Sequence, residues 1–168
     1  MNRVGIALGS NLGDRRELLC SAREYLKEMN LAGEPFLQSS LYSTEPLGCP
    51  DGSQPYLNAV VELMWAGTAE DLLLHCQWIE RELGRVRTHV RCEPRTADVD
   101  LIYVGDKIIH SPHLIVPHPR AHLRKFVLKP LSDIRPDLVL PGQKQTVQEL
   151  LESLDSDEPD PFLYQTEW

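Results

Sequence analysis

Two aspartates at the start of an apolar run are the first residues in this sequence whose spacing suggests chemistry. Asp98 and Asp100 open a β-branched and aliphatic stretch that ends at the turn pair Gly105-Asp106. Because strand side chains alternate between two faces, both carboxylates project from one face, roughly 7 Å apart. Carboxylate oxygens suit Mg²⁺, which keeps several waters and commonly shares a phosphate ligand. Taken alone, this spacing is also typical of a strand end whose two acids are simply solvated.

Positive charge gathers just before this pair. Residues 85–95 contain four arginines and one acid, Glu93, so they carry +3 on a chain of net charge −8. The arginines are Arg85, Arg87, Arg91 and Arg95. A positive island on an acidic protein indicates a small anionic ligand held locally, and the acidic balance opposes general nucleic-acid binding. Acids and arginines together predict a site for metal ions and phosphates.

Hydrophobic periodicity predicts the elements that must position these groups. We expect strands at residues 4–8, 36–44, 56–65, 97–104 and 107–116. The last two strands should form a hairpin around Gly105-Asp106. In the aspartate strand, alternation places Val99, Leu101 and Tyr103 together on the face opposite the carboxylates.

Helices are predicted from apolar spacing and from residues that can cap their first turns. We expect helices at residues 15–30, 69–83, 123–131 and 146–154. Asp14 and Thr146 are suitable N-caps, each with a glutamate three residues later, and Gly84 is a suitable end for the second helix. The third helix should be irregular and interrupted by Pro130.

Length and composition indicate one globular domain. The chain has 168 residues, of which 42% are hydrophobic and 25% charged. Its four cysteines form no Cys-x-x-Cys pair, and we see no leader and no apolar run of membrane length, so we expect a reduced cytoplasmic protein with free thiols. A structural zinc site is the alternative for four crowded histidines, but no tight Cys/His framework supports it. These are His110, His113, His118 and His122.

Several motifs, in this order along the chain, resemble the hydroxymethyl-dihydropterin pyrophosphokinases of folate biosynthesis. They are Gly9-Ser-Asn-Leu12, Tyr42-Ser-Thr-Glu-Pro-Leu-Gly48, Tyr56-Leu-Asn-Ala59, Pro94-Arg-Thr-Ala-Asp-Val-Asp-Leu101 and Val116-Pro-His-Pro-Arg120. The resemblance covers residues 4 to about 154, so we expect a single domain over 1–154 and a loosely ordered acidic tail over 155–168. It implies an α/β (α+β) fold of ferredoxin-like type, in which helices cover both faces of an antiparallel sheet in three α-β-α layers.

The resemblance also implies a reaction and a set of site residues. The β,γ-diphosphate of ATP would pass to the hydroxymethyl group of the pterin and release AMP, with two Mg²⁺ ions bound by Asp98 and Asp100. Catalytic roles would fall to Arg85, Arg95, Asp98 and Asp100. The nucleotide would contact Gln77, Glu80, Arg87, Arg91, Leu101, His118 and Arg124. The pterin pocket would use Thr44, Glu45, Leu47, Tyr56, Asn58 and Phe126.

Asn58 has a second interpretation that does not depend on the resemblance. It is a polar residue among Leu57, Ala59 and Val60, and a buried amide needs a hydrogen-bond partner. It would serve either the pterin edge or, as a strand-edge amide, only the local backbone. Beyond small-molecule substrates we expect no nucleic acid and no membrane partner, and the chain would be a monomer or a homodimer.

The sequence departs from the family pattern just before Pro94. A Trp-Gly pair is expected there, and Cys92 and Glu93 stand in its place, while Thr88 replaces a residue that is often basic. An indole stacking surface is lost, and a negative charge is added near the phosphates. Residues 85–95 are expected to close over the phosphates as a lid.

Because these departures affect the lid, the alternative function is a catalytically weakened pterin- or nucleotide-binding protein of the same fold. A ferredoxin-like RNA-binding module is a third class, opposed by the acidic charge.

Overall fold

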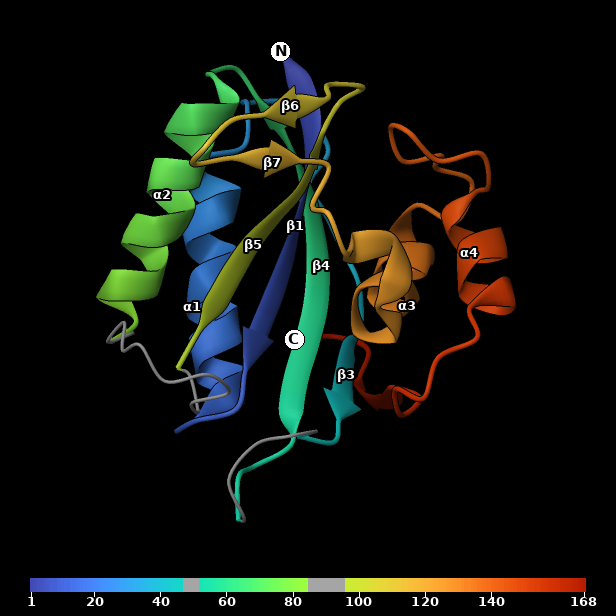
Figure 1. Ribbon diagram of the computed structural model, residues 1–168. Helices are drawn as coiled ribbons and strands as arrows, with labels where there is room; N and C mark the ends of the chain where they lie inside the picture. Colours follow the sequence, from blue (N-terminus) through green and yellow to red (C-terminus); the bar gives the residue numbers. More distant parts are fainter. Residues whose placement is uncertain (47–51, 85–95) are drawn as a thin grey trace.

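A five-strand sheet path forms the centre of the molecule. The computed structural model describes residues 1–46, 52–84 and 96–168. Figure 1 shows the sheet standing between two pairs of helices. Along the chain, the elements up to the aspartate strand are β1 (Asn2–Ser10), α1 (Arg15–Glu28), β2 (Leu37–Gln38), β3 (Leu41–Thr44), β4 (Tyr56–Trp65), α2 (Ala69–Glu82) and β5 (Asp98–Val104).

The strand order identifies the fold. The path runs β5-β1-β4-β3-β8, with β2 pairing beside β4 and with β8 spanning Phe162–Gln165. Each pair of neighbours is antiparallel. Without the short strands, the chain reads β-α-β-β-α-β with β4 inserted between the parallel strands β1 and β3, which is the split arrangement of ferredoxin-like folds. The predicted fold class is confirmed.

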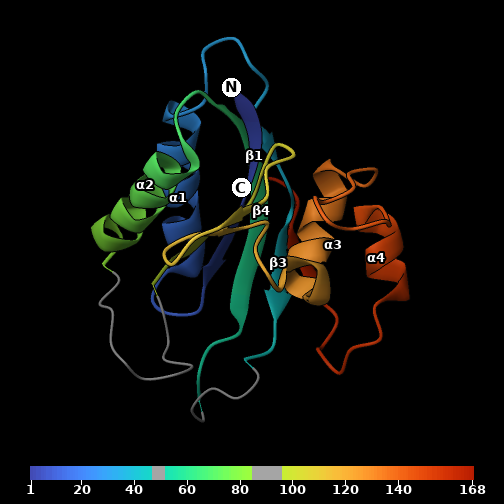
Figure 2. The same ribbon diagram turned by 45° about the horizontal axis from the view of Figure 1, so that its top comes forward.

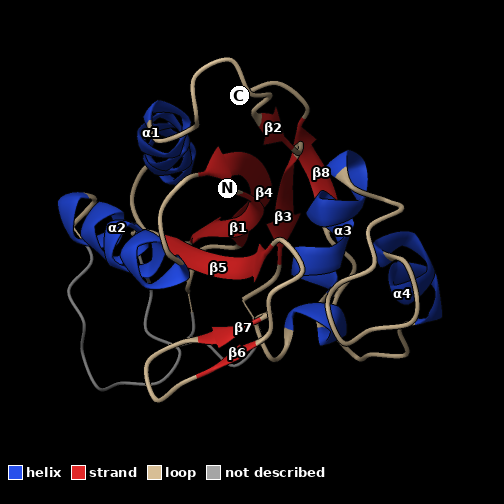
Figure 3. Ribbon diagram, turned by 90° about the horizontal axis from the view of Figure 1, so that it is seen from above, coloured by secondary structure: helices blue, strands red, loops and turns tan. Residues whose placement is uncertain are grey.

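Helices cover both faces of this sheet, as predicted. Figures 1 and 2 show α1 and α2 on one side, with α3 (Lys125–Ile134) and α4 (Val147–Ser153) on the other. The view from above in Figure 3 gives the same three layers. The first core, between the sheet and α1 and α2, includes Leu8, Leu19, Leu63 and Leu72. The second core, between the sheet and α3 and α4, includes Val60, Ile102, Leu128 and Val147.

Local sequence explains where the helices begin. The Asp14 carboxylate accepts the Glu17 N–H at the start of α1. Thr68 and Thr146 open α2 and α4, each within a reciprocal capping box, so orphan N–H groups of both first turns are satisfied. Gly84 follows α2 with φ of 82°, a conformation that glycine adopts without steric cost. The predicted starts of α1, α2 and α4 are confirmed.

The alternation expected along the aspartate strand is wrong beyond Leu101. In the ladder between β1 and β5, Ile6 pairs with Leu101 and Gly5 pairs with Tyr103, so Ile102 is an extra residue in β5. Such a β-bulge resets the alternation of faces. Val99 and Leu101 therefore lie in the first core, whereas Tyr103 lies in the second.

The hairpin expected around Gly105-Asp106 does not form. Instead β6 (Ile109–His110) and β7 (Ile115–Val116) pair with each other in a separate small sheet. The turn between them is closed by Ser111, whose N–H bonds the Leu114 carbonyl and whose Oγ accepts the Leu114 N–H. Pro112, which has no N–H to donate, stands inside that turn, so residues 107–116 cannot run as one strand.

Two further elements differ in detail from their predictions. The strand expected over 36–44 is divided into β2 and β3, because the Ser39 Oγ accepts the Val60 N–H between them. The third helix continues through Pro130 to Ile134, and the interruption lies at Arg124, between a 3₁₀ turn (Ala121–Leu123) and α3. Burial of the helix face around Leu128 offsets the one backbone bond that the proline removes.

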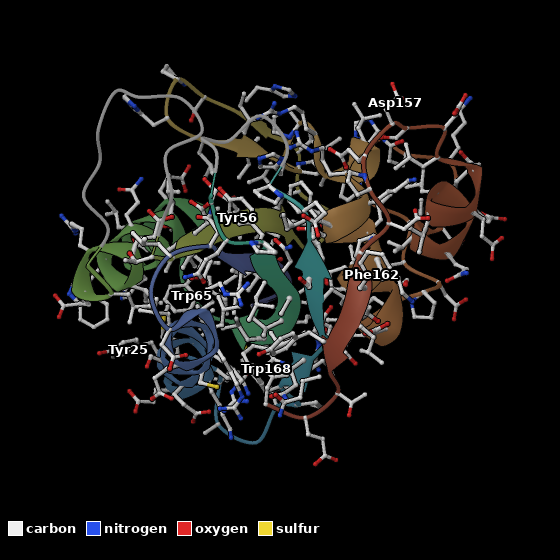
Figure 4. All side chains as sticks on the ribbon, turned by 90° about the horizontal axis from the view of Figure 1, so that it is seen from below. Tyr25, Tyr56, Trp65, Asp157, Phe162 and Trp168 are labelled. Atoms are coloured by element: carbon white, nitrogen blue, oxygen red, sulfur yellow. The ribbon has the colours of Figure 1, made fainter. Side chains whose placement is uncertain are left out.

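The acidic tail is ordered where we expected a loosely held segment. Residues 162–165 form β8, which pairs with β3 and extends the sheet by one strand. Trp168, labelled in Figure 4, is buried in the first core and donates its indole N–H to the Ser39 carbonyl at 2.8 Å. The Arg23 guanidinium lies 4.9 Å from the centre of the Trp168 ring. The tail is thus part of the packed structure.

We predict that Trp168→Ala lowers the free energy of unfolding by about 2–4 kcal/mol, because it removes a buried ring and a hydrogen bond. Urea titration followed by circular dichroism measures this change. Phe162→Ala is the matched control, since that tail ring is 66% exposed and its loss should cost less than about 0.5 kcal/mol. Equal losses in the two variants would contradict a structural role for the Trp168 contact.

Candidate active site

One row of cross-strand partners brings a predicted metal-binding acid and a predicted pterin residue to the same end of the sheet. Gly9 on β1 pairs with Asp98 on β5 and with Asn58 on β4, which in turn pairs with Tyr42 on β3. Directly opposed residues project from the same face of an antiparallel sheet. A Cβ atom on Gly9 would lie 3.4 Å from Asn58 Oδ1 and 3.8 Å from Asp98 Cβ. The glycine therefore leaves space between the acid and the amide.

Asn58 is held by a side chain and not by the backbone alone. Its Nδ2 donates to Thr44 Oγ1 at 2.8 Å, and both residues are buried. Thr44 pairs with Tyr56 across β3 and β4, and Figure 4 shows Tyr56 at the start of β4. β4 is an interior strand, so the strand-edge interpretation of this amide is wrong. Three of the predicted pterin residues thus form one cluster.

Helix α2 holds the start of β5 through a buried carboxylate. Glu80 is 3% exposed, and its Oε1 accepts the N–H of Val99, between the two aspartates, at 3.0 Å. Gln77, three residues earlier on α2, is half-buried. Burial, together with the negative charges of Glu80 and Asp100, raises the pKa of the Cys76 thiol to about 12. Glu80 therefore fixes the backbone between the two aspartates from the helix side of the sheet.

The predicted nucleotide residue His118 lies beside β5. Its backbone N–H donates to the Ile102 carbonyl at 2.8 Å, and its ring Nδ1 accepts the backbone N–H of Arg120 at 3.2 Å. An accepting Nδ1 places the proton of the neutral ring on Nε2. Burial lowers the pKa of His118, and the positive charges of Arg120 and Arg124 lower it further. The ring is therefore a neutral hydrogen-bond donor at neutral pH.

Arg124 and Phe126 meet at the start of α3, and the tail supplies an anion there. The Arg124 guanidinium lies 4.8 Å from the centre of the Phe126 ring. Its Nε lies 2.6 Å from Glu158 Oε1, and the other oxygen of Glu158 accepts the Lys125 N–H at 3.0 Å. The Glu158 carboxylate thus pairs with Arg124, a residue that is predicted to contact the nucleotide.

Some predicted residues lie elsewhere. Leu101 has its side chain in the first core, so a contact with nucleotide would have to use its backbone. Glu45 is exposed at the end of β3. The positions that fall outside the described residues are Leu47, Arg85, Arg87, Arg91, Arg95 and the departures at Thr88, Cys92 and Glu93. The lid expected over 85–95 falls there as well.

Two negative findings apply to residues 1–46, 52–84 and 96–168. No group of three or more His, Cys, Asp or Glu side chains in these ranges is arranged to hold a metal ion, so the zinc alternative finds no support. No helix in the same ranges is long and apolar enough to cross a membrane. Cys20 and Cys76 are free thiols.

Sequence reasoning missed two residues that support the site. Arg15, at the start of α1, donates to the Pro55 carbonyl and so ties down the residue before Tyr56. Glu158 was hidden in a tail whose composition indicated only loose order. Neither has a local signal, because each partner lies more than thirty residues away in the chain.

A ferredoxin-like sheet with two carboxylates on its edge strand, the Asn58–Thr44 pair and a nearby His/Arg cluster is typical of α/β proteins that bind phosphate groups. Comparison with known proteins specifies the family: residues 5–136 match the model of 7,8-dihydro-6-hydroxymethylpterin-pyrophosphokinase (HPPK). The chain belongs to this family, whose members use ATP as co-substrate. It is 44% identical over 135 residues to the 2-amino-4-hydroxy-6-hydroxymethyldihydropteridine pyrophosphokinase of Bacillus subtilis, covering 80% of this chain and 79% of that protein.

Some relatives are much longer than this chain, which spans about a fifth of their length. It is 41% identical over 166 residues to a folic acid synthesis protein of Pneumocystis carinii, covering 96% of this chain but 22% of that protein. Among solved structures, an HPPK-DHPS in complex with substrates superposes with a TM-score of 0.68 at 13% identity, over 90% of this chain and 43% of the other. A Plasmodium falciparum HPPK-DHPS with pteroate gives a TM-score of 0.69 at 15% identity, over 90% and 42%. These structures agree with the fold.

We predict that Glu158→Gln lowers the KM for ATP by up to about fivefold. The variant frees the Arg124 guanidinium from a partly exposed ion pair, and such pairs are worth up to about 1 kcal/mol. Steady-state kinetics at low salt, where surface charge is least screened, measures the effect. Asp157→Asn is the control, since it removes the same charge from an exposed position in the same tail. An equal fall in KM in both variants would show a general charge effect and contradict the specific contact.

Proposed function

We propose that this chain transfers the β,γ-diphosphate of ATP to the hydroxymethyl group of 6-hydroxymethyl-7,8-dihydropterin. The hydroxymethyl oxygen forms a bond to the β-phosphorus as the bond from that phosphorus to the α-phosphate oxygen breaks, and AMP leaves. The observation that carries the proposal is the row Asp98, Gly9, Asn58. In this row the Asn58 amide, proposed for the pterin, and the Asp98 carboxylate, proposed for the metal, are two strands apart, roughly 10 Å, on one face of the sheet.

The pterin is proposed to bind over the start of β4. Asn58 and Thr44 offer amide and hydroxyl groups to its edge, and their mutual hydrogen bond fixes the orientation of the Asn58 amide. Tyr56 and Phe126, both half-buried, are suited to its faces. Such preorganised polar groups in an apolar setting determine the orientation of a flat ligand.

The donor set at β5 fits Mg²⁺. Asp98 and Asp100 present two hard carboxylates at an edge strand, and the described residues gather no third acidic or histidine ligand around them. That set suits an ion which completes its shell with water and phosphate oxygens. When bound, two such ions would neutralise charge on the transferred diphosphate and on both oxygens of the displacement.

The remaining residues are proposed to position the nucleotide. His118 offers a neutral Nε2–H to a phosphate oxygen, because its Nδ1 is already an acceptor for the Arg120 N–H. Arg124 adds positive charge at the start of α3 once its guanidinium turns from Glu158 to a phosphate. Arg85, Arg87, Arg91 and Arg95 are proposed to contact the phosphates from the segment before β5. Phosphoryl-type transfer depends mainly on such positioning and charge neutralisation.

The setting of this reaction is also a proposal. We expect a cytoplasmic protein, a monomer or a homodimer, whose partners are its small-molecule substrates. Residues 1–154 are proposed to carry the activity, and residues 155–168 to support it by packing against them.

We predict that Asp100→Asn lowers the rate of AMP formation from ATP and the pterin by at least roughly 100-fold. Loss of a metal-binding charge removes several kcal/mol of transition-state stabilisation, and each 1.36 kcal/mol is about tenfold in rate. Asp106→Asn is the matched control, because Asp106 is an exposed acid just beyond the other end of β5. Wild-type turnover in Asp100→Asn would contradict the metal role, and absence of AMP with the wild-type protein would overturn the proposed function.

A further inference from the structure

A second polar cluster lies at the opposite end of the sheet from the aspartates. Glu62 on β4 has no exposed surface, and its carboxylate accepts a short hydrogen bond from the Tyr103 hydroxyl. The same carboxylate pairs with Arg135 at 2.9 Å and with Arg3 at 3.5 Å. This buried carboxylate has a full set of partners, and nothing in the proposed reaction uses it.

Tyr103 reaches Glu62 by crossing the strand between them. β1 lies between β5 and β4, and at this level it contributes Gly5, which pairs with both Tyr103 and Glu62. A Cβ atom on Gly5 would overlap the Tyr103 ring, so the ring occupies the space that the missing side chain leaves. Burial raises the pKa of the Tyr103 hydroxyl, and the Glu62 charge raises it further, so the hydroxyl stays a donor. Ring and hydroxyl together fix the position of Tyr103.

This arrangement determines the bulge in β5. Gly5 and Ile6 are adjacent, yet they pair with Tyr103 and Leu101, so Ile102 is accommodated between two fixed partners. In a bulge the extra residue leaves the regular ladder, and its backbone groups turn away from their usual directions. The Ile102 carbonyl accepts the His118 N–H at 2.8 Å. The bulge thus provides the attachment point of the segment that carries His118.

We propose that Tyr103 is a positioning residue for the nucleotide site: its bond to Glu62 and its contact with Gly5 hold the Ile102 bulge, and the bulge holds His118 in place beside β5. This inference rests on the proposed function only where it concerns ATP. Its structural step, from Tyr103 through Ile102 to the His118 amide, can be measured without any substrate.

Tyr103→Phe is the decisive variant, because it keeps the ring over Gly5 and removes only the hydroxyl. Hydrogen exchange of the free protein should show the His118 amide exchanging about fivefold faster or more, as expected for loss of one stabilising hydrogen bond. Amides of β4 near Val60 exchange through global unfolding, so their exchange should change only as much as the global stability of the variant changes. In kinetics, the KM for ATP should rise about fivefold while the KM for the pterin stays unchanged.

Thr146→Ala is the control for stability alone, since it removes the capping box of α4, remote from β5. It should leave the His118 amide and both KM values unchanged at temperatures well below its melting point. Unchanged His118 exchange in Tyr103→Phe overturns the proposal, as does a rise of both KM values together. If the wild-type protein forms no AMP, the proposed function fails, yet faster His118 exchange in the variant still supports the positioning role.

Discussion

The small size of Gly5, Ala7 and Gly9 along one face of β1 is the constraint on which both ends of the molecule depend. Gly5, Ala7 and Gly9 are the residues that this strand directs toward α3. At one end, Gly9 leaves room between Asp98 and Asn58; at the other, Gly5 is covered by the Tyr103 ring. A Cβ atom at Gly5 would overlap the Tyr103 ring, whereas one at Gly9 would touch Asn58 and Asp98 at ordinary contact distance. Close packing in sheet interiors leaves little freedom for anything larger at Gly9.

Much of this arrangement follows from the sequence because it is local. A few neighbouring residues determine each of three features: the spacing of Asp98 and Asp100, the ten-residue strand β4, and the capped helix starts. The family motifs implied the fold, which the structure confirms, and they are the basis for proposing Asn58 as a site residue. Strand alternation, however, could not anticipate the bulge at Ile102, because its cause lies in Gly5 and Glu62, far away along the chain.

The tail illustrates the same limit in a different way. Its acidic composition is typical of loosely ordered segments, yet composition does not record long-range partners. Glu158 and Asp160 find Arg124 and Lys125, and Trp168 fits against α1 and the Ser39 carbonyl. Each contact is modest, but each becomes available only once α3 and β3 are already in place. Order in this segment is therefore a product of the finished fold.

Because the tail adds β8, the sheet ends in a strand that is open on its outer side. Phe162, Leu163 and Tyr164 of this strand are 66%, 59% and 50% exposed, a combination that invites edge-to-edge pairing with other chains. Acids stand on both sides of the three apolar residues, with Asp160 before them and Glu167 after. In an antiparallel encounter between two copies, these acids would be brought close together and would repel. Asp160 and Glu167 thus oppose aggregation through the exposed edge of β8. The negative charge of the tail also favours colloidal stability and the local ion pairs.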